Sequence, residues 1–275
     1  MKVKNEQSGI GRKWTMITGF GLLLISMSTF VACKKYSFDE SGESTFLEVE
    51  EANSSVLFYY SSTSEPNCGS VGYDQFESYL SVYDSTDALA TLTFGDVGGF
   101  NNDTIFVAHS EAFPILDVPA FQPNLISNGV AGTISSHRTQ TVVANSACDL
   151  TVGSSILTLN TTTQFFQDLE EGSEYYLTPY IVVDSILAPQ AGHPDTPSTY
   201  HRKVVTDVAR LPNYPVRYLG YKITSGAINK GYRVNLKFEA YRDPSWIDPD
   251  KISVILVLTK RTNGVIEFVN ANTNY

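Results

Sequence analysis

Cysteine is the residue type with the widest chemistry in this chain, and it occurs at three positions, Cys33, Cys68 and Cys148. No two of them have the Cys-x-x-Cys spacing that dithiol exchange requires. Cys33 ends the tetrapeptide Phe30-Val31-Ala32-Cys33, the pattern at which bacterial lipoproteins are cleaved and acylated. The spacing therefore predicts one lipid-bearing cysteine and two other thiols, Cys68 and Cys148, which a single disulfide could join in an oxidising compartment.

The segment before Cys33 has the features of a secretion signal. Residues 1–13 carry four basic side chains and one acid, and residues 14–32 are almost entirely apolar or small. An uncleaved membrane anchor would share the apolar run, but the small residues and the cysteine directly before Lys34-Lys35 favour cleavage. We expect a signal peptide over residues 1–32, with Cys33 carrying acyl chains that anchor the chain in the outer membrane. This covalent lipid is the only cofactor that we expect.

The charge of the remaining chain excludes one class of partner. Removal of residues 1–32 takes away four of the 19 basic residues and one of the 29 acidic residues, which leaves 15 against 28, a net charge of −13. Such a charge disfavours nucleic acid and anionic lipid headgroups. The partners that we expect are the membrane, through the lipid, and an unidentified protein or peptide.

The mature chain divides by pattern into a tether and two domains. Residues 33–53 mix acids with serine and glycine and lack periodicity, which predicts a flexible tether. Residues 54–146 alternate strand-like and helix-like segments, and residues 147–275 are almost entirely strand-like. The predicted fold class is therefore α+β.

The first domain resembles the thioredoxin fold. Its expected elements are a strand at 56–60, a helix at 73–83, a strand at 88–94, a helix at 105–116 and a strand at 124–128, with a third helix near 136–144. Cys68 lies at the first strand-to-helix turn, and Val118-Pro119 lies where that fold has a cis-proline beside a substrate groove. The positions three residues from Cys68 are Glu65 and Val71, so the redox motif is degenerate at Cys68.

The second domain is predicted to be an antiparallel β-sandwich. Val234, Leu236, Phe238 and Ala240 alternate with polar residues, as in a strand with one buried face. Asn263-Gly264 between two strand-like runs indicates a two-residue hairpin, because this pair accepts the positive φ angles of a type I′ turn. Further strands are expected at 155–161, 175–184, 216–224, 252–260 and 265–270.

Together these segments resemble the Bacteroidetes outer-membrane lipoprotein family named for a 28-kilodalton Omp protein. The likeness is carried by residues 180–186 with Gln190, 200–205, Trp246, 249–258 and 265–271. It implies a thioredoxin-like domain followed by a β-sandwich, in a protein of the outer membrane. In these bacteria, acids shortly after the acylated cysteine mark lipoproteins for the cell surface, and Asp39-Glu40 with Glu43 resembles that signal. Both the periplasmic face and the cell surface stay open.

Other chemistry is poorly supported. His193 and His201 flank Asp195 in a proline-rich loop, but their spacing matches no compact zinc pattern, and we predict no metal site. The sequence has no nucleophile elbow, no His-Glu-x-x-His motif and no nucleotide-binding glycine loop.

Three functions are compatible with these residues. The first is a lipid-anchored binding or assembly protein without catalysis, which would use the groove beside Val118 and Pro119. The second is a thiol-redox or thiol-handling protein that uses Cys68. The third is a surface glycan-binding protein, which would need exposed aromatic side chains on the sandwich.

Overall fold

The computed structural model describes residues 46–274, except 116, 195–197 and 243–247. The chain forms two units, residues 1–38 and 39–275, and the description below concerns the second. The predicted signal peptide and Cys33 lie outside the described residues, as do Asp195 and Trp246. No helix among the described residues is long and apolar enough to cross a membrane.

The fold is α+β and contains more strand than helix, as the sequence predicted. The helices are a π-helical turn η1 (Cys68–Gly72), α1 (Tyr73–Tyr83), α2 (Asp103–Ala112), α3 (Val130–Arg138) and a 3₁₀ turn η2 (Pro249–Lys251). The first strands are β1 (Val56–Ser62), β2 (Ala88–Phe94), β3 (Asp96–Val97), β4 (Phe100–Asn101) and β5 (Ala120–Pro123). The remaining strands are β6 (Ala144–Val152), β7 (Ile156–Phe165), β8 (Glu174–Val183), β9 (Ile186–Pro189), β10 (Ser198–His201), β11 (Val204–Val208), β12 (Tyr221–Ser225), β13 (Arg233–Tyr241), β14 (Ile252–Thr262) and β15 (Val265–Thr273).

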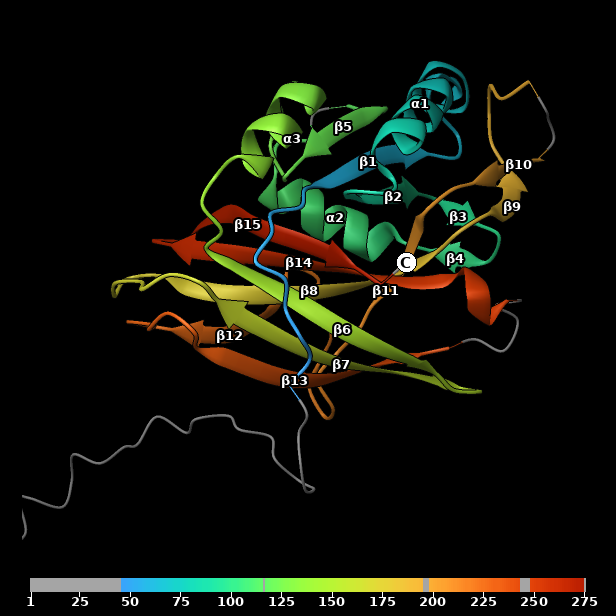
Figure 1. Ribbon diagram of the computed structural model, residues 1–275. Coiled ribbons are helices and arrows are strands. Elements are labelled where there is room, and N and C mark those ends of the chain that lie inside the picture. The colour runs from blue at the N-terminus through green and yellow to red at the C-terminus, as the bar shows by residue number, and fades with distance from the viewer. Residues whose placement is uncertain (1–45, 116, 195–197, 243–247, 275) are drawn as a thin grey trace, which may run out of the picture. The chain divides into compact units, whose positions relative to one another are not determined.

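One large sheet joins the two predicted domains. Its strand order is β15-β14-β8-β11-β2-β1-β5, with β12 also paired to β8 (Figure 1). The halves meet where Val204 of β11 pairs in parallel with Thr91 of β2, and the backbone N–H of Thr91 donates to the carbonyl of Lys203 at 2.7 Å. The predicted division between residues 146 and 147 is therefore corrected, because it falls inside β6 and both halves share one sheet.

Helix α2 lies inside the curve of this sheet. Phe58 of β1, Ile105 of α2 and Val182 of β8 belong to one buried apolar cluster, and the Phe58 and Tyr180 rings meet edge to face at 5.5 Å. Figure 1 shows α2 between β1 and β2 on one side and β8 and β14 on the other. The two halves thus share a core, which explains why neither is a separate body.

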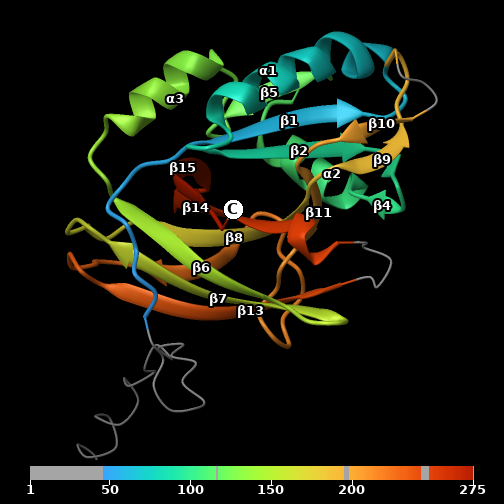
Figure 2. The ribbon, with the colours of Figure 1, turned by 45° about the vertical axis from the view of Figure 1, so that its right-hand side comes forward.

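A second sheet, in the order β13-β7-β6, packs against the other face of the β8 and β14 region (Figure 2). Leu159 of β7 and Phe238 of β13 share a buried cluster with Leu177 of β8 and Leu256 of β14. The alternation predicted for 232–241 is confirmed, since Leu236, Phe238 and Ala240 are buried. This part of the fold is sandwich-like, as predicted.

Helices α1 and α3 cover the outer face of β1 and β2. Phe76 and Leu80 of α1 and Ile134 of α3 pack with Leu57 and Leu89, so the amphipathic helix predicted at 73–83 is confirmed. The third helix is α3 at 130–138, earlier than the expected 136–144. The strand expected at 124–128 is β5 at 120–123, because Asn124 and Leu125 adopt positive φ angles of 54° and 65° and turn the chain.

The end of the predicted tether is part of the folded body. The backbone N–H of Leu47 donates to Thr162 Oγ1 at 3.0 Å, and Asn145 Nδ2 donates to the carbonyl of Glu50 at 3.0 Å. Val49 is buried. Residues 46–53 are therefore corrected from tether to folded chain, because strands far away in the sequence satisfy their backbone groups.

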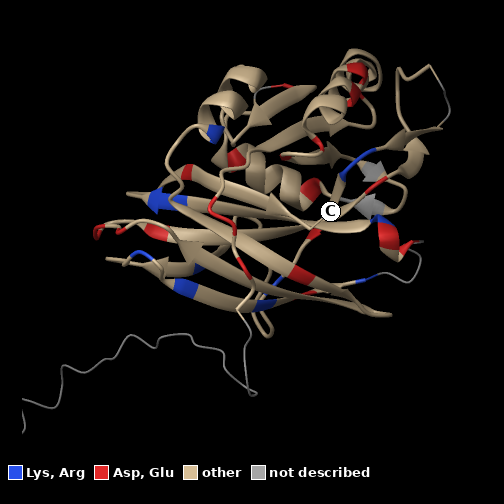
Figure 3. Ribbon diagram, viewed as in Figure 1, with Lys and Arg blue, Asp and Glu red and all other residues tan. Residues whose placement is uncertain are grey.

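Charged side chains do not gather into one basic surface in the part of the chain that is described. Lys and Arg are scattered over separate elements (Figure 3), and the ion pairs of Lys222 with Glu174 and of Lys237 with Glu239 are exposed. Exposed pairs of this kind contribute about 0–1 kcal/mol each.

Candidate functional site

Cys68 lies at the turn that follows β1, where η1 begins and leads into α1. Its side chain is 2% exposed, and its carbonyl accepts a hydrogen bond from Tyr59 Oη at 2.9 Å. Burial raises the pKa of the Cys68 thiol, and hydrogen bonds from Ser62 and Ser61 offset only part of that effect. Because the thiolate is the nucleophilic form, this environment keeps Cys68 protonated and poorly reactive at neutral pH.

Pro119 packs directly against this turn. The Val118–Pro119 peptide bond is cis, as the sequence predicted. A Cβ atom on Gly72 would lie 2.8 Å from Pro119 Cβ and 2.6 Å from Tyr59 Oη, so glycine is required at that position. A hollow of about 570 Å³ lies further along β5, lined by Pro114, Asp117, Ala120, Phe121, Gln122 and residues 127–129. That this region binds a ligand stays a prediction.

The loop between β9 and β10 covers the same turn. Gln190 Nε2 donates to the carbonyl of Ser62 at 3.0 Å and lies within 3.3 Å of the carbonyl of Glu65. The backbone N–H of Ala191 donates to the carbonyl of Thr63 at 2.9 Å. Gln190 is 5% exposed, so these contacts form a buried polar seam between the loop and the end of β1.

Two glycines allow the loop and the turn to approach this closely. A Cβ on Gly69 would lie 2.1 Å from the carbonyl oxygen of Ala191, and a Cβ on Gly192 would lie 2.2 Å from that of Pro66. Gly192 also has a φ of +76°. Backbone therefore packs on backbone at Pro66 and Gly69, the residues on either side of Asn67 and Cys68.

Cys148 has a different position from the one that a disulfide with Cys68 would need. It lies in β6 of the second sheet, whereas Cys68 lies at the start of η1, and both are free thiols. The bridge allowed by the cysteine count is therefore corrected. Burial, with Asp149 as a smaller cause, raises the pKa of Cys148 to about 12, so this thiol is also held protonated.

The histidines are buried in three separate places. His193 and His201 are both 7% exposed and belong to the segment formed by β9, β10 and their connecting loop, and the His193 ring meets Tyr73 edge on at 4.5 Å. Burial, and to a smaller degree His193, lowers the pKa of His201. Asp195 lies outside the described residues. Within the described part of the chain, no three His, Cys, Asp or Glu side chains lie close enough to hold a metal ion.

His109 of α2 links the two halves of the core. Its Nδ1 lies 3.0 Å from Tyr60 Oη, and its Nε2 lies 2.7 Å from Tyr180 Oη. Burial lowers the pKa of His109 to about 3, so the ring is neutral and can donate through one nitrogen and accept through the other. The side chain is 0% exposed, and its role is structural.

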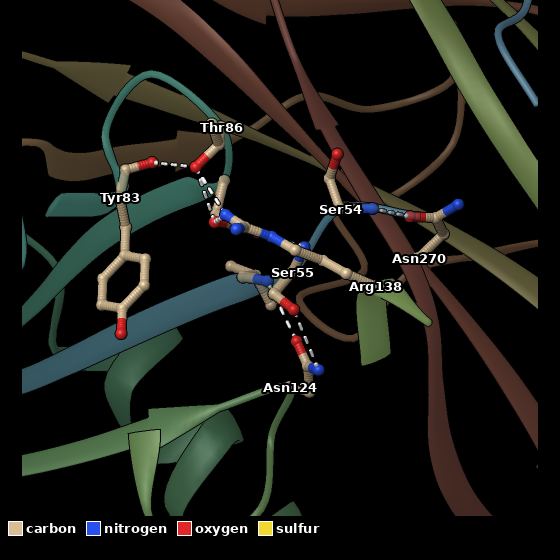
Figure 4. A network of polar contacts seen from close by, with 9 residues as sticks. Ser54, Ser55, Tyr83, Thr86, Asn124, Arg138 and Asn270 are labelled. Atoms are coloured by element: carbon tan, nitrogen blue, oxygen red, sulfur yellow. Dashed lines mark hydrogen bonds and ion pairs between the residues drawn. The ribbon is translucent and has the colours of Figure 1, made fainter. Parts of the chain in front are cut away.

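A buried polar network fixes the point where the chain enters the body (Figure 4). Asp87 accepts from the backbone N–H of Ser55 at 2.9 Å and pairs with Arg138 of α3. Asn270 of β15 accepts from the backbone N–H of Ser54 at 2.9 Å and donates to the carbonyl of Ala144 at 2.9 Å. One short segment is thereby held to β2, α3, β6 and β15 at once.

The chain is similar in fold to HBP35 of Porphyromonas gingivalis. The two structures superpose with a TM-score of 0.64 and 14% sequence identity, over 82% of this chain and 76% of that chain. HBP35 is a protein from a Bacteroidetes bacterium. At 14% identity, the similarity between the two structures shows a shared fold and nothing more.

Other comparisons add little. Two crystal structures of β-glucosidase from Kluyveromyces marxianus, one selenomethionine-labelled and one in complex with glucose, match with TM-scores of 0.20 and identities of 9% and 8%. Each match covers 48% of this chain and 14% of that chain, and neither carries an argument. No protein-family model matches the sequence, and no curated protein matches it.

The sequence predicted the positions of Cys68 and Pro119, but it did not predict that the loop between β9 and β10 packs on the turn at Cys68. Gln190 is among the residues that carry the family resemblance, but nothing near it in the sequence indicated contact with Ser62. Gly69 and Gly192 carried a weak signal, since glycines in two distant loops often mark a close backbone approach. Pairing the two would have required the tertiary structure.

Proposed function

We propose that this chain is a lipid-anchored binding or assembly protein of the outer membrane or cell surface, and that it works without catalysis. One observation carries the absence of thiol chemistry in this proposal: Cys68 is buried in the turn against which Gln190 and Ala191 pack, and it has no second thiol at redox spacing. The residues from β1 to α3 would then keep a thioredoxin-like arrangement whose reactive turn has been closed. Fold similarity to a Bacteroidetes protein supports the predicted cell envelope location.

The anchoring part of the proposal depends on Cys33. Mass spectrometry of the chain isolated from membranes should show loss of residues 1–32 and addition of acyl chains to Cys33. The Cys33→Ser variant should keep the signal segment and lose the acyl mass. A wild-type chain that retains residues 1–32 would contradict the lipoprotein assignment.

The non-catalytic part depends on Cys68. We expect Cys68 in the native full chain to react with 4,4′-dithiodipyridine at least about a hundredfold more slowly than glutathione at the same pH, because the group is buried and its pKa is raised. Urea-unfolded protein gives the accessible reference rate. If native Cys68 reacted as fast as glutathione, the thiol-handling function would replace this proposal.

A further inference from the structure

The outer edge of β15 is closed along only part of its length. β15 is an end strand of the large sheet. Near its C-terminus, the backbone N–H of Ala271 donates to the carbonyl of Ser54 at 3.1 Å. The entering chain therefore already lies beside this edge and makes one backbone hydrogen bond to it. Along residues 265–268, no described residue outside the β14–β15 hairpin hydrogen-bonds to the backbone.

The geometry of the hairpin shows which backbone groups face outward. Asn263 and Gly264 have φ angles of 52° and 84° and form the two-residue turn, so Thr262 and Val265 are a hydrogen-bonded pair. Hydrogen-bonded pairs alternate along an antiparallel ladder, and Glu267 opposite Lys260 is the next. The N–H and C=O groups of Ile266 and Phe268 consequently face away from β14.

A groove of about 590 Å³ lies between this open edge and α3. One wall is the face of α3 that carries Gly132, where an added Cβ would meet nothing within 4 Å. The His137 ring meets Phe268 edge on at 5.0 Å. The other lining residues are Asn124, Leu125, Ile126, Asn128, Gly129, Thr133, Ser136, Gln140, Ile266 and Glu267.

The composition of the groove limits its occupant. Its lining includes one acid, Glu267, and no Lys or Arg, so an acidic ligand has no counter-charge there. Ile126 in the lining is 45% exposed, and Val265, next to the lining, is 61% exposed, which offers apolar contacts beside the open backbone groups. An extended, neutral or basic polypeptide matches both features, because its main chain can pair with the edge and its alternate side chains can enter the groove.

We propose that the groove between α3 and β15 binds an extended segment of a partner protein, which adds to the large sheet as a strand beside Ile266 and Phe268. The inference rests on the proposed binding function and specifies its surface and ligand class. The partner strand would continue the line in which residues 52–54 already follow the same edge. In this arrangement the chain itself covers the edge at Ala271, and the partner strand covers it at Ile266.

The test uses the full chain and random peptides of about 12 residues displayed on phage, the length of a strand with flanks. Enriched sequences are synthesised, and their affinity is measured by fluorescence polarisation. Gly132→Trp fills the groove, and Ala131→Trp places the same side chain on an exposed neighbouring position of α3 outside the lining. We expect Gly132→Trp to weaken binding by at least about tenfold and Ala131→Trp to change it by less than about twofold.

Backbone pairing is tested within the best peptide. Methylation of one amide nitrogen at a time should weaken binding by about tenfold at every second residue and little at the residues between, because only alternate N–H groups face the edge. The inference would be overturned by an equal loss at adjacent positions, or by a library that enriches no peptide on wild type over Gly132→Trp. It would also be overturned if wild type formed a dimer in light scattering that Gly132→Trp abolished, since the occupant would then be a second copy. Acylation at Cys33 is measured separately, so the anchoring proposal can stand while this one fails.

Discussion

The turn after β1 and the groove beside β15 are two places on one sheet where backbone groups could meet a polypeptide, and they differ in what covers them. At the turn, the chain provides its own cover, since Gln190 and Ala191 bond to the carbonyls of Ser62 and Thr63. At the groove, the chain covers β15 at Ala271 and stops short of Ile266 and Phe268. The comparison shows that the turn near Cys68 differs from the groove in the accessibility of its backbone groups, in addition to lacking a second thiol.

The largest expected effect is on the free energy of unfolding, when one methyl group is added to a glycine at the turn or to a glycine at the groove. Gly69→Ala should lower the free energy of unfolding by about 3 kcal/mol, because the new Cβ would meet the Ala191 carbonyl oxygen at 2.1 Å. Gly132→Ala, in the open groove, should raise it by up to about 1 kcal/mol through helix propensity. Urea unfolding measures both, and a Gly69→Ala variant as stable as wild type would mean that the turn is not closed.

The next effect concerns the polar seam over Cys68. Gln190→Leu keeps a similar side-chain size but removes the donor shared by the carbonyls of Ser62 and Glu65, and it should cost about 2 kcal/mol. The reaction of Cys68 with 4,4′-dithiodipyridine should become at least about tenfold faster, since the loop would open more often. Asn128→Leu, at an exposed position of the groove, is the control, with unchanged stability and unchanged Cys68 reactivity.

A smaller effect is expected on acidification. Burial lowers the pKa of both His201 beside the turn and His137 beneath the groove. In each case the unfolded chain binds more protons below pH about 6.5, so this stability is present above that pH and falls by at most about 1.4 kcal/mol per pH unit and histidine below it. Hydrogen bonds with the backbone of Pro189 and Ala188 offset part of the lowering of the pKa at His201, and Gln140, Asp87 and the backbone of Ser54 offset part of it at His137. Acidification should therefore loosen both the loop over the turn and α3.

Hydrogen exchange measures both effects. The Ala191 amide, bonded to Thr63, and the Thr133 amide of α3, bonded to Gly129, should each lose protection between pH 7 and pH 5, after correction for intrinsic exchange rates. His201→Gln should remove most of the loss at Ala191 and leave the loss at Thr133 unchanged. An unchanged loss at Ala191 in His201→Gln would contradict the assignment of that effect to His201.

The smallest effect tests whether the thiol itself matters. Cys68→Ala should lower stability by about 1 kcal/mol, the cost of one buried small group, and should leave peptide affinity at the β15 groove unchanged. Thermal unfolding and fluorescence polarisation measure the two quantities. Loss of peptide binding in Cys68→Ala, with stability retained, would show that the turn and the groove are one functional site.

The parts of the fold that the sequence predicted correctly are those with a short-range cause. Phe76 and Leu80 are buried on one face of α1, as the helical spacing required. Asn263 and Gly264 form the two-residue hairpin turn because their positive φ angles are local properties. The cis bond before Pro119 has a different basis, because the resemblance to the thioredoxin fold implied it and no local pattern did.

The errors arose where distant segments decide the structure. Asn124 interrupts the strand expected at 124–128, because its side chain accepts from the backbone N–H of Val56 while its own backbone turns. Residues 46–53 were expected to be a tether, since their composition is polar, but Thr162 and Asn145 bind their backbone. The composition of a segment does not show which distant residues will bind its backbone.

The sequence by itself determined the acidic charge, the absence of a redox pair at Cys68, the prediction of lipid attachment at Cys33, the amphipathic helix α1 and the turn of the last hairpin. Only the tertiary structure decided that β11 pairs with β2 and merges two predicted domains, that Gln190 closes the turn over Cys68, and that β15 keeps an open edge. The physical reason is the range of the interactions. Periodicity and turn propensity act over a few residues, whereas strand pairing and burial join residues more than a hundred positions apart.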